Sequence, residues 1–356
     1  LHIIHQPSPV CEMNQIFSRP RSIRCTRAFA ANFSAAIPHQ VRGFASLPVK
    51  MKPTPSKESH IERTAAEPRD PSLHTVTVSR VDQVNESIRL FRLGIREGSS
   101  IEKFSPGQWL DTFVPGVPKP GGFTITSQPS KATLPSSAYL ELAVQKSPSN
   151  PPAAWLWGHP VDDGDAGGHS HSTESEPAQL LVRVGGSFVW PPQGIDLAPI
   201  RRIVFVAGGV GINPLMSILS HLAEGSEYPY NMQFLYSTKT PAEGLDTEKI
   251  LFLGRLAAIY GREKVQGQLK LFLTNIQETS GPNETVLPCN ELEVPIKKRR
   301  MTLKDVAEAL GPKEEHGSAV VYVCGVPAMT DEFVGKLTSP DGLDLKPEQV
   351  LCEKWW

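Results

Sequence analysis

Three glycines just ahead of a proline, Gly208, Gly209 and Gly211 before Pro214, have the residue types and spacing to do chemistry. They stand in "VFVAGGVGINPLMSIL" (204–219), where a β-prone apolar run leads straight into a helical-looking segment. Glycines at the end of a buried strand remove the side chains that would keep a phosphate group away from backbone N–H groups. Proline fits the first helical turn, because its missing N–H has no intrahelical partner there. The stretch therefore indicates either a pyrophosphate-binding turn or a purely structural one.

A second strand end repeats this pattern. In "YVCGVPAMTDEF" (322–333) a buried run reaches Cys324 and Gly325, and then Pro327 opens a helix. In an open parallel sheet, ligands bind beyond the carboxyl ends of the strands. Two glycine-bearing strand ends at one edge therefore point to a ligand between them, although a lone cysteine is more commonly a small core residue.

The elements that must hold these turns fall into two regions. Short alternating apolar runs from residue 74 onward predict an antiparallel barrel or sandwich over 74–199. After Ile200, continuous apolar strands alternate with helical segments, which predicts a parallel sheet covered on both faces over 200–356. The expected fold class is thus an antiparallel β-barrel followed by a doubly wound parallel α/β sheet. Residues 277–301 are expected to be a long surface excursion.

The first 44 residues differ from the rest of the chain. They hold a single acid, Glu12, and five arginines: Arg19, Arg21, Arg24, Arg27 and Arg42. A basic, serine-bearing and acid-poor segment is typical of a mitochondrial transit peptide, and a disordered basic tail is the alternative. We therefore expect a transit peptide over 1–44, cut after Phe44, and a mitochondrial location. The proline-rich residues 45–73 are expected to form a linker.

Composition excludes several classes of protein. No apolar run among the 356 residues approaches the roughly 20 needed to cross a bilayer, so we expect no integral membrane segment. A net charge of −1 gives no electrostatic footprint for nucleic acid. The five cysteines include no C-x-x-C pair, which argues against a zinc or iron–sulfur site. His169 and His171, in a polar insertion, are interpreted as loop residues, so no metal site is predicted.

Four motifs together resemble a known group of proteins. "GGFTITS" (121–127), "AGGVGINP" (207–214), "CGVPAM" (324–329) and the terminal "EKWW" (353–356) resemble the ferredoxin–NADP reductase superfamily. Within it, the chain is most similar to the oxidoreductase NAD-binding domain-containing proteins. The resemblance covers residues 74–356, and it implies a flavin-binding barrel of Greek-key type followed by an NAD(P)-binding α/β domain.

The resemblance also implies roles for residues of the barrel. Phe123 would pack on the flavin, and Thr124 would hydrogen-bond flavin N5, where the hydride arrives. Ser127 closes the motif, and Val144 lies in the strand whose backbone would bind the flavin ring. Two departures stand out, because relatives usually have Arg at the place of Gly121 and Ser at the place of Ala153 to hold the flavin phosphates. FMN, weakly bound FAD or no flavin at all therefore stay open.

In the α/β domain the resemblance places the nicotinamide dinucleotide on the glycine turn. Cys324 and Met329 would lie beside the nicotinamide, and Trp356 would stack on the flavin ring, ordinary packing being the alternative for Trp356. The implied catalytic residues are Thr124, Cys324 and Trp356. The expected dinucleotide-binding residues are Gly208, Gly209, Val210, Gly211, Ile212, Asn213, Pro214, Cys324, Gly325 and Met329.

The identity of the dinucleotide stays open at this point. A cation near the ribose favours NADP and an acid favours NAD, and the sequence after the second α/β strand offers Ser237 and Lys239 as well as Glu243. The leading hypothesis is a flavin-dependent NAD(P)H oxidoreductase that passes electrons to an unknown external acceptor. The alternative is a non-catalytic nucleotide-binding sensor or assembly factor that retains the fold.

Overall fold

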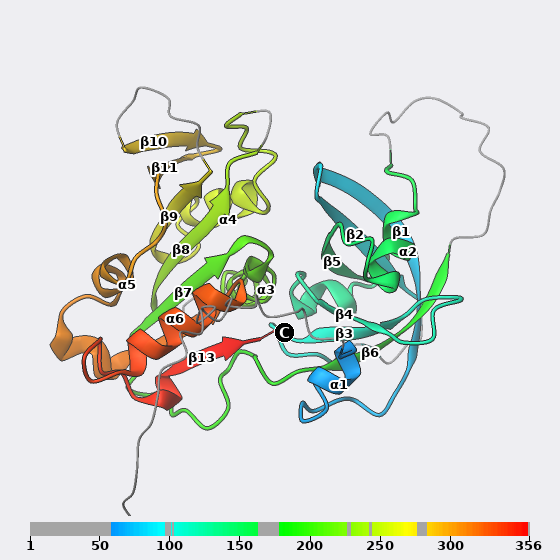
Figure 1. Ribbon diagram of the computed structural model, residues 1–356, viewed down its shortest axis with the longest axis horizontal. Helices are drawn as coiled ribbons and strands as arrows, with labels where there is room; N and C mark the ends of the chain where they lie inside the picture. The colour runs from blue at the N-terminus through cyan, green and yellow to red at the C-terminus, as the bar shows by residue number, and fades with distance from the viewer. Residues whose placement is uncertain are drawn as a thin grey trace, which may run out of the picture. The chain divides into compact units, whose positions relative to one another are not determined.

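The computed structural model describes residues 58–96, 101, 103–162, 178–225, 229–241, 244–275 and 283–354, all within the unit Pro55–Trp356. They contain one six-stranded antiparallel sheet and one seven-stranded, mostly parallel sheet (Figure 1). The expected transit peptide over 1–44, the histidines His169 and His171, and the terminal Trp356 lie outside the described residues.

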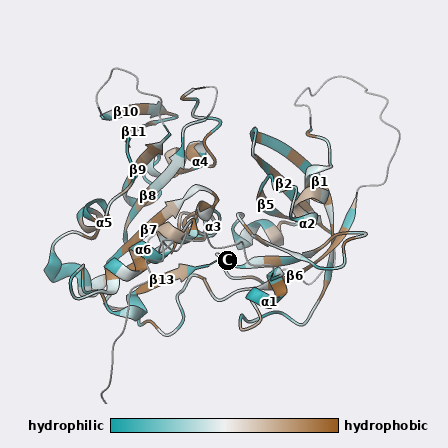
Figure 2. Ribbon diagram, in the orientation of Figure 1, coloured by the Kyte–Doolittle hydropathy of each residue, from teal (hydrophilic) through white to brown (hydrophobic). Residues whose placement is uncertain are grey.

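The six-stranded sheet closes into a barrel. Its strand order is β4-β3-β6-β1-β2-β5, and a bridge between Ile125 and Leu142 joins the two outermost strands. Polar and apolar residues alternate along β1 and β2 (Figure 2), because one face of each strand turns inward. The strands are β1 (His74–Asn85), β2 (Ile88–Ile95), β3 (Trp109–Phe113), β4 (Gly121–Thr124), β5 (Tyr139–Gln145) and β6 (Gln179–Gly185), with helix α2 (Pro151–Trp157) after β5.

The seven-stranded sheet has the order β10-β11-β9-β8-β7-β12-β13. Helices α3 and α4 pack on one face, and α5 and α6 contribute to a separate apolar cluster on the other. The barrel and the doubly wound sheet confirm the predicted fold class. The parallel strands are β7 (Arg202–Gly208), β8 (Asn231–Lys239), β9 (Gln266–Thr274), β12 (Ala319–Cys324) and β13 (Val350–Glu353), and the helices are α3 (Ile212–Leu222), α4 (Leu253–Gly261), α5 (Leu303–Leu310) and α6 (Pro327–Thr338).

The described residues also form four short 3-10 helices. They span Pro129–Thr133, Gly209–Gly211, Lys313–Ser318 and Pro347–Gln349. The second of them is the glycine turn, so this turn is itself a regular element between β7 and α3.

The expectation of a surface excursion over residues 277–301 is wrong for the part that the structure describes. Strands β10 (Glu284–Cys289) and β11 (Leu292–Lys297) form an antiparallel hairpin, and β11 pairs with β9 in parallel. Asn290 makes the tight turn with φ of 52°. Prolines within both strands hid the strand pattern, and β10 tolerates its proline because it lies at the edge of the sheet.

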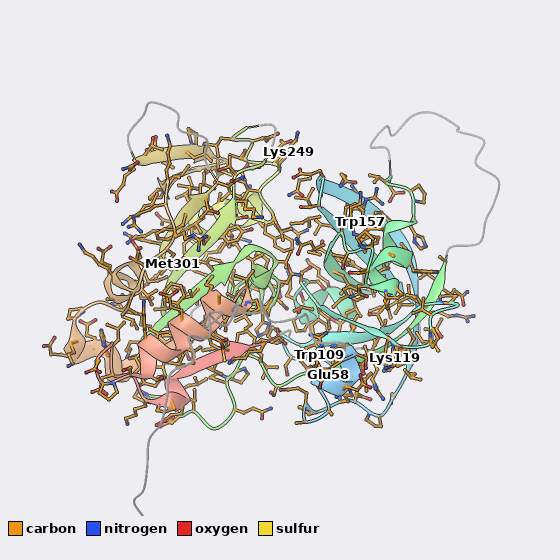
Figure 3. The ribbon with its side chains drawn as sticks, in the orientation of Figure 1. Glu58, Trp109, Lys119, Trp157, Lys249 and Met301 are labelled. Carbon is orange, nitrogen blue, oxygen red and sulfur yellow. The ribbon has the colours of Figure 1, made fainter. Side chains whose placement is uncertain are left out.

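Residues 58–73, part of the expected linker, pack on the barrel instead. Helix α1 (His60–Arg63) lies on the barrel near Trp109, which Figure 3 labels. The ring centroids of His60 and Trp109 are 4.7 Å apart. His60 Nε2 is 3.0 Å from Asp111 Oδ1, and Arg69 Nε donates to Asp111 Oδ2 at 3.0 Å. Polar contacts hold this segment, so apolar periodicity gave no sign of its packing.

Helices long and apolar enough to cross a membrane do not occur among residues 58–354, the gaps aside. The same residues contain no group of three His, Cys, Asp or Glu side chains that could hold a metal ion.

Candidate functional site

The glycine turn lies at the carboxyl edge of the parallel sheet, between β7 and α3. Gly209 has a φ of +54°, a left-handed conformation that side chains disfavour. A Cβ atom added to Gly209 would meet nothing within 4 Å, so the outer face of the turn is bare backbone. Such a cradle at a helix N-terminus fits the pyrophosphate of a dinucleotide. Val210, half-buried, and Ile212 and Pro214, both buried, continue from the turn into α3.

The other two glycines of the motif do a different job. A Cβ on Gly208 would lie 2.5 Å from Met329 Sδ, and a Cβ on Gly211 would collide with the carbonyl group of Cys324. Gly325 Cα is 3.3 Å from that Gly208 Cβ position. These glycines let the ends of β7 and β12 approach closely, so of the three only Gly209 has open space. The structure thus brings together the two strand ends that the sequence singled out.

Two buried polar atoms beside this turn have no hydrogen-bond partner among the described residues. They are Asn213 Oδ1, at the start of α3, and Thr330 Oγ1, in the first turn of α6. A buried polar atom without a partner costs roughly 1–3 kcal/mol, which a ligand that supplies the partner would recover. Both atoms therefore support a polar ligand at this edge of the sheet.

The barrel presents its own motif to the α/β domain. Thr124 Oγ1 is buried, and no partner for it occurs in the described part of the chain. Ser127 Oγ accepts from the Glu141 N–H at 3.1 Å, and Val144 is buried in the barrel core. The Thr124 hydroxyl therefore has no partner within the described residues, and its hydrogen bond to a flavin ring atom stays a prediction.

Phe123 packs in the barrel core beside Gly121 and Pro152, and its contact with a flavin stays a prediction. Only 8% of Phe123 is exposed, and its ring carbon Cε2 is 2.7 Å from where a Cβ of Gly121 would be. Pro152 Cβ lies 2.8 Å from the same point. Because Gly121 has no side chain, Phe123 and Pro152 fill the space that an arginine there would need.

The residues at the expected flavin-phosphate end do not fit a phosphate clamp. Helix α2 begins with Pro151 and Pro152, which have no N–H, and the Asn150 side chain accepts from the Ala153 N–H at 3.4 Å. Lys119, a cation close to the motif in sequence, lies 3.4 Å from Glu62. Among the described residues at the start of α2 and around Gly121, neither a free N–H group nor an arginine is therefore placed to hold a phosphate.

Direct hydrogen bonds join helix α3, which follows the glycine turn, to the barrel. Asn213 Nδ2 donates to the Ala143 carbonyl at 3.0 Å, and Ser217 Oγ donates to the Ser127 carbonyl at 2.8 Å. Arg255 in α4 donates twice to buried Glu141 of β5, each time at 2.6 Å. Helix α3 is thereby joined to β5 and to the end of the barrel motif, and α4 is joined to β5.

Glu353 is an acidic residue at this site that was not predicted from the sequence. It stands opposite Cys324 in the pairing of β12 with β13, and its Oε2 is buried without a partner among the described residues. Burial, and to a lesser degree the charge of Glu67, raise the pKa of Glu353 well above its ordinary value. The protonated carboxyl is therefore favoured there. The signal was the "EKWW" motif itself, in which only the tryptophan was assigned a role.

Comparisons with known proteins agree with this geometry. No family model matches the chain. It is 32% identical over 311 residues to oxidoreductase NAD-binding domain-containing protein 1 of Xenopus laevis, covering 83% of this chain and 84% of that protein. It is 25% identical over 255 residues to the propane 2-monooxygenase reductase component of Rhodococcus jostii (strain RHA1), covering 71% and 56%.

Among solved structures, the ferredoxin reductase in carbazole 1,9a-dioxygenase superposes with a TM-score of 0.54 and 16% identity, covering 80% of this chain and 70% of that one. The fold is that of the ferredoxin–NADP reductase superfamily, a barrel followed by a dinucleotide-type α/β domain. Within that class, the chain belongs to the family of oxidoreductase NAD-binding domain-containing protein 1.

Proposed function

We propose that the chain is an NAD(P)H-dependent oxidoreductase that transfers hydride from nicotinamide to a flavin, from which electrons leave to an external acceptor. The observation that carries this proposal is the direct hydrogen bonding of α3 to the barrel, through Asn213 to β5 and through Ser217 to Ser127 of the barrel motif. A nucleotide on the glycine turn would thereby have a fixed position relative to Thr124. The reductase names among the relatives support the same reaction class.

Each side of this site has a definite task in the proposed reaction. The bare backbone at Gly209 binds the dinucleotide pyrophosphate, and the strand end at Cys324 and Gly325 orients the nicotinamide ring. Thr124 donates its unpaired hydroxyl to the flavin ring. A flavin bound there supplies a hydride acceptor that can pass electrons on singly.

We expect the flavin to be held through its ring, because the phosphate end offers no anchors. Riboflavin, FMN and FAD should then bind residues 45–356 with affinities within roughly fivefold of one another, since a missing charge-assisted bond removes the advantage of the phosphates. Fluorescence titration of the three flavins measures this directly. FAD that copurifies, or binds a hundredfold tighter than riboflavin, would contradict the expectation.

Thr124→Val and Thr112→Val form a matched pair for the same titration. Both hydroxyls are buried without a partner among the described residues, and they lie on neighbouring strands of one barrel. Thr124→Val should lower the affinity for each of the three flavins by roughly tenfold, because a hydrogen bond to the ring is lost. Thr112→Val should leave flavin binding unchanged. Equal effects of the two variants would show that Thr124 has no special contact with the ring.

A non-catalytic nucleotide-binding sensor or assembly factor is the second candidate. The misfit at Gly121 and the proline-opened α2 favours it, since a protein without turnover does not need the flavin phosphates. NAD(P)H oxidation measured with flavin and an artificial one-electron acceptor separates the candidates. Nucleotide binding without any oxidation would favour the sensor.

We also propose mitochondrial import through residues 1–44. Their basic, acid-poor composition supports this location. N-terminal sequencing of the protein recovered from mitochondria should find a chain that begins near residue 45.

A further inference from the structure

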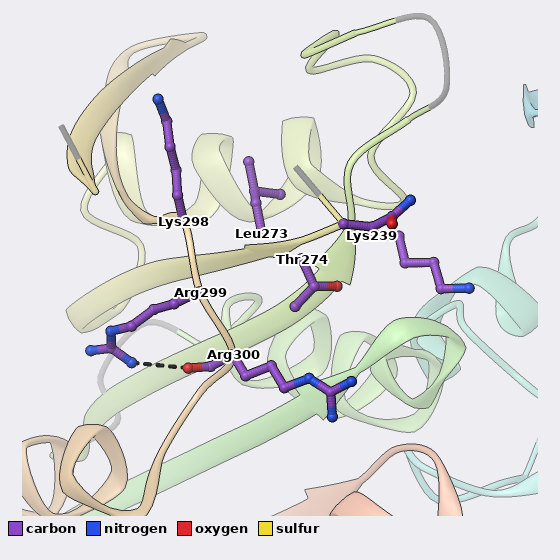
Figure 4. Close-up of a pocket in the computed structure, with 7 residues that line it drawn as sticks. Lys239, Leu273, Thr274, Lys298, Arg299 and Arg300 are labelled. Atoms are coloured by element: carbon purple, nitrogen blue, oxygen red, sulfur yellow. Dashed lines mark hydrogen bonds between the residues drawn. The ribbon is translucent and has the colours of Figure 1, made fainter. Parts of the chain in front are cut away.

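A cationic cavity of about 430 Å³ opens at the carboxyl edge of the parallel sheet (Figure 4). The ends of β8 and β9 form it together with the segment that leads from β11 to α5. None of the described residues that line it is acidic. The lining residues are Lys239, Leu273, Thr274, Asn275, Lys298, Arg299 and Arg300.

The positive charge of this cavity is only partly neutralised. Arg299 donates twice to Asp305, at 2.6 and 2.7 Å. Lys239, Lys298 and Arg300 make no ion pair with any residue in the described ranges. Like charges that gather around one cavity repel each other, so an anion bound there would relieve the repulsion and accept their hydrogen bonds.

The cavity lies beside the glycine turn. Gly208 pairs with Ser237 of the neighbouring strand β8, and two residues further along, Lys239 pairs with Thr274 of β9. Neighbouring strands are about 4.8 Å apart, so the cavity begins about one to two strand spacings from the turn. In a dinucleotide the adenosine ribose adjoins the pyrophosphate, and a 2′-phosphate on it is one sugar ring away.

We propose that this cavity binds the 2′-phosphate of NADP(H), which makes NADPH rather than NADH the preferred coenzyme; this inference rests on the proposed function. The residues after Tyr236 support it, because they are Ser237, Thr238 and Lys239, with no acid to hold a free ribose 2′-hydroxyl. Glu243, the acid that could favour NAD, lies outside the described residues. Figure 4 shows Lys298 pointing in the opposite direction to Thr274, so Lys239 and Arg300 are the cations to test.

The experiment uses the full chain and nucleotide fragments, so it needs neither flavin nor turnover. Isothermal titration should show 2′,5′-ADP binding roughly ten- to hundredfold tighter than 5′-ADP, since only the former carries the 2′-phosphate. The advantage should shrink at high salt, because the contributing cations are exposed. The double variant Lys239→Ala/Arg300→Ala should remove the advantage and leave 5′-ADP binding unchanged. Lys264→Ala, an exposed cation just before the opposite end of β9, is the matched control and should change neither.

The possible results separate this inference from the proposed function. Equal binding of 2′,5′-ADP and 5′-ADP overturns the cavity assignment and leaves the oxidoreductase proposal standing. Failure of the folded chain to bind either fragment, NADH or NADPH overturns both. An advantage that survives in the double variant also overturns the assignment, because the 2′-phosphate would then lie elsewhere.

Discussion

Gly209→Val should lower the affinity for NAD(P)H by at least a hundredfold and leave flavin binding as it is. The added side chain would project from the outer face of the turn into open space. It would occupy the volume that the pyrophosphate needs in order to reach the backbone N–H groups. A hundredfold loss corresponds to about 2.7 kcal/mol of binding free energy. Titration of NADPH and of riboflavin against the same protein measures both effects.

This substitution also strains the backbone, so it needs a control. Gly194 has a φ of +75° and, like Gly209, would hold a Cβ atom with nothing within 4 Å. Gly194→Val therefore carries a comparable cost of about 1–2 kcal/mol in stability, away from the turn. If the affinity for NAD(P)H fell equally in both variants, the cause would be backbone strain and not a steric block of the pyrophosphate site. Gly211→Val is the poorer test, because it would collide with Cys324.

Asp111→Asn should be the most destabilising single substitution that we consider. The carboxylate is fully buried in β3 and accepts from Arg69, from Arg183 at 2.6 Å, and contacts His60. Removing its charge leaves two arginines without their anion, and breaking a buried ion pair in this way costs about 3–5 kcal/mol. We expect a melting temperature lower by roughly 10 °C, measured by thermal unfolding. Asp82→Asn, which removes the half-buried partner of exposed Arg80, should change the melting temperature little.

The same carboxylate predicts how stability depends on pH. Burial alone would raise the pKa of Asp111, but hydrogen bonds from His60, Arg183 and Arg69 outweigh it and hold the pKa below its ordinary 3.8. A carboxyl group whose pKa falls on folding stabilises the protein above its unfolded value, and that contribution is lost as the pH falls through the folded value. Stability should therefore drop below about pH 4 in the native chain. This drop should be shallower in Asp111→Asn.

The parts of the fold that the sequence predicted are those governed by short-range periodicity. Two patterns are strong local signals: the alternation of polar and apolar residues along 74–85, and the continuous apolar run before Gly208. Each pattern reflects which residues of its own strand are buried. The barrel, the parallel sheet and the two glycine-bearing strand ends follow from such signals. Helix α5 is likewise bounded by local signals, because Thr302 and Asp305 form a capping box at its start and Gly311 follows its last residue.

The features that the sequence did not reveal depend on contacts between distant residues. One such feature is the role of Gly208 and Gly211 in strand packing. It can be seen only once Met329 and Cys324 are placed next to these glycines in the fold. The buried state of Glu353 similarly depends on neighbours far away in the chain. The cavity at Lys239 forms because β11 pairs with β9 and so places Arg300 near the end of β9. The prolines in β10 and β11 kept this hairpin from being predicted from the sequence.

The packing of residues 58–73 on the barrel limits where a protease can shorten this protein. A cut after Phe44 would leave His60 and Arg69 on the chain, and both contact Asp111. A cut before His74, where the first strand begins, would remove both and leave the buried carboxylate with Arg183 alone. Maturation of the N-terminus is therefore compatible with a stable barrel only upstream of the Ser59 cap of α1, and limited proteolysis should yield a resistant core that still contains this segment.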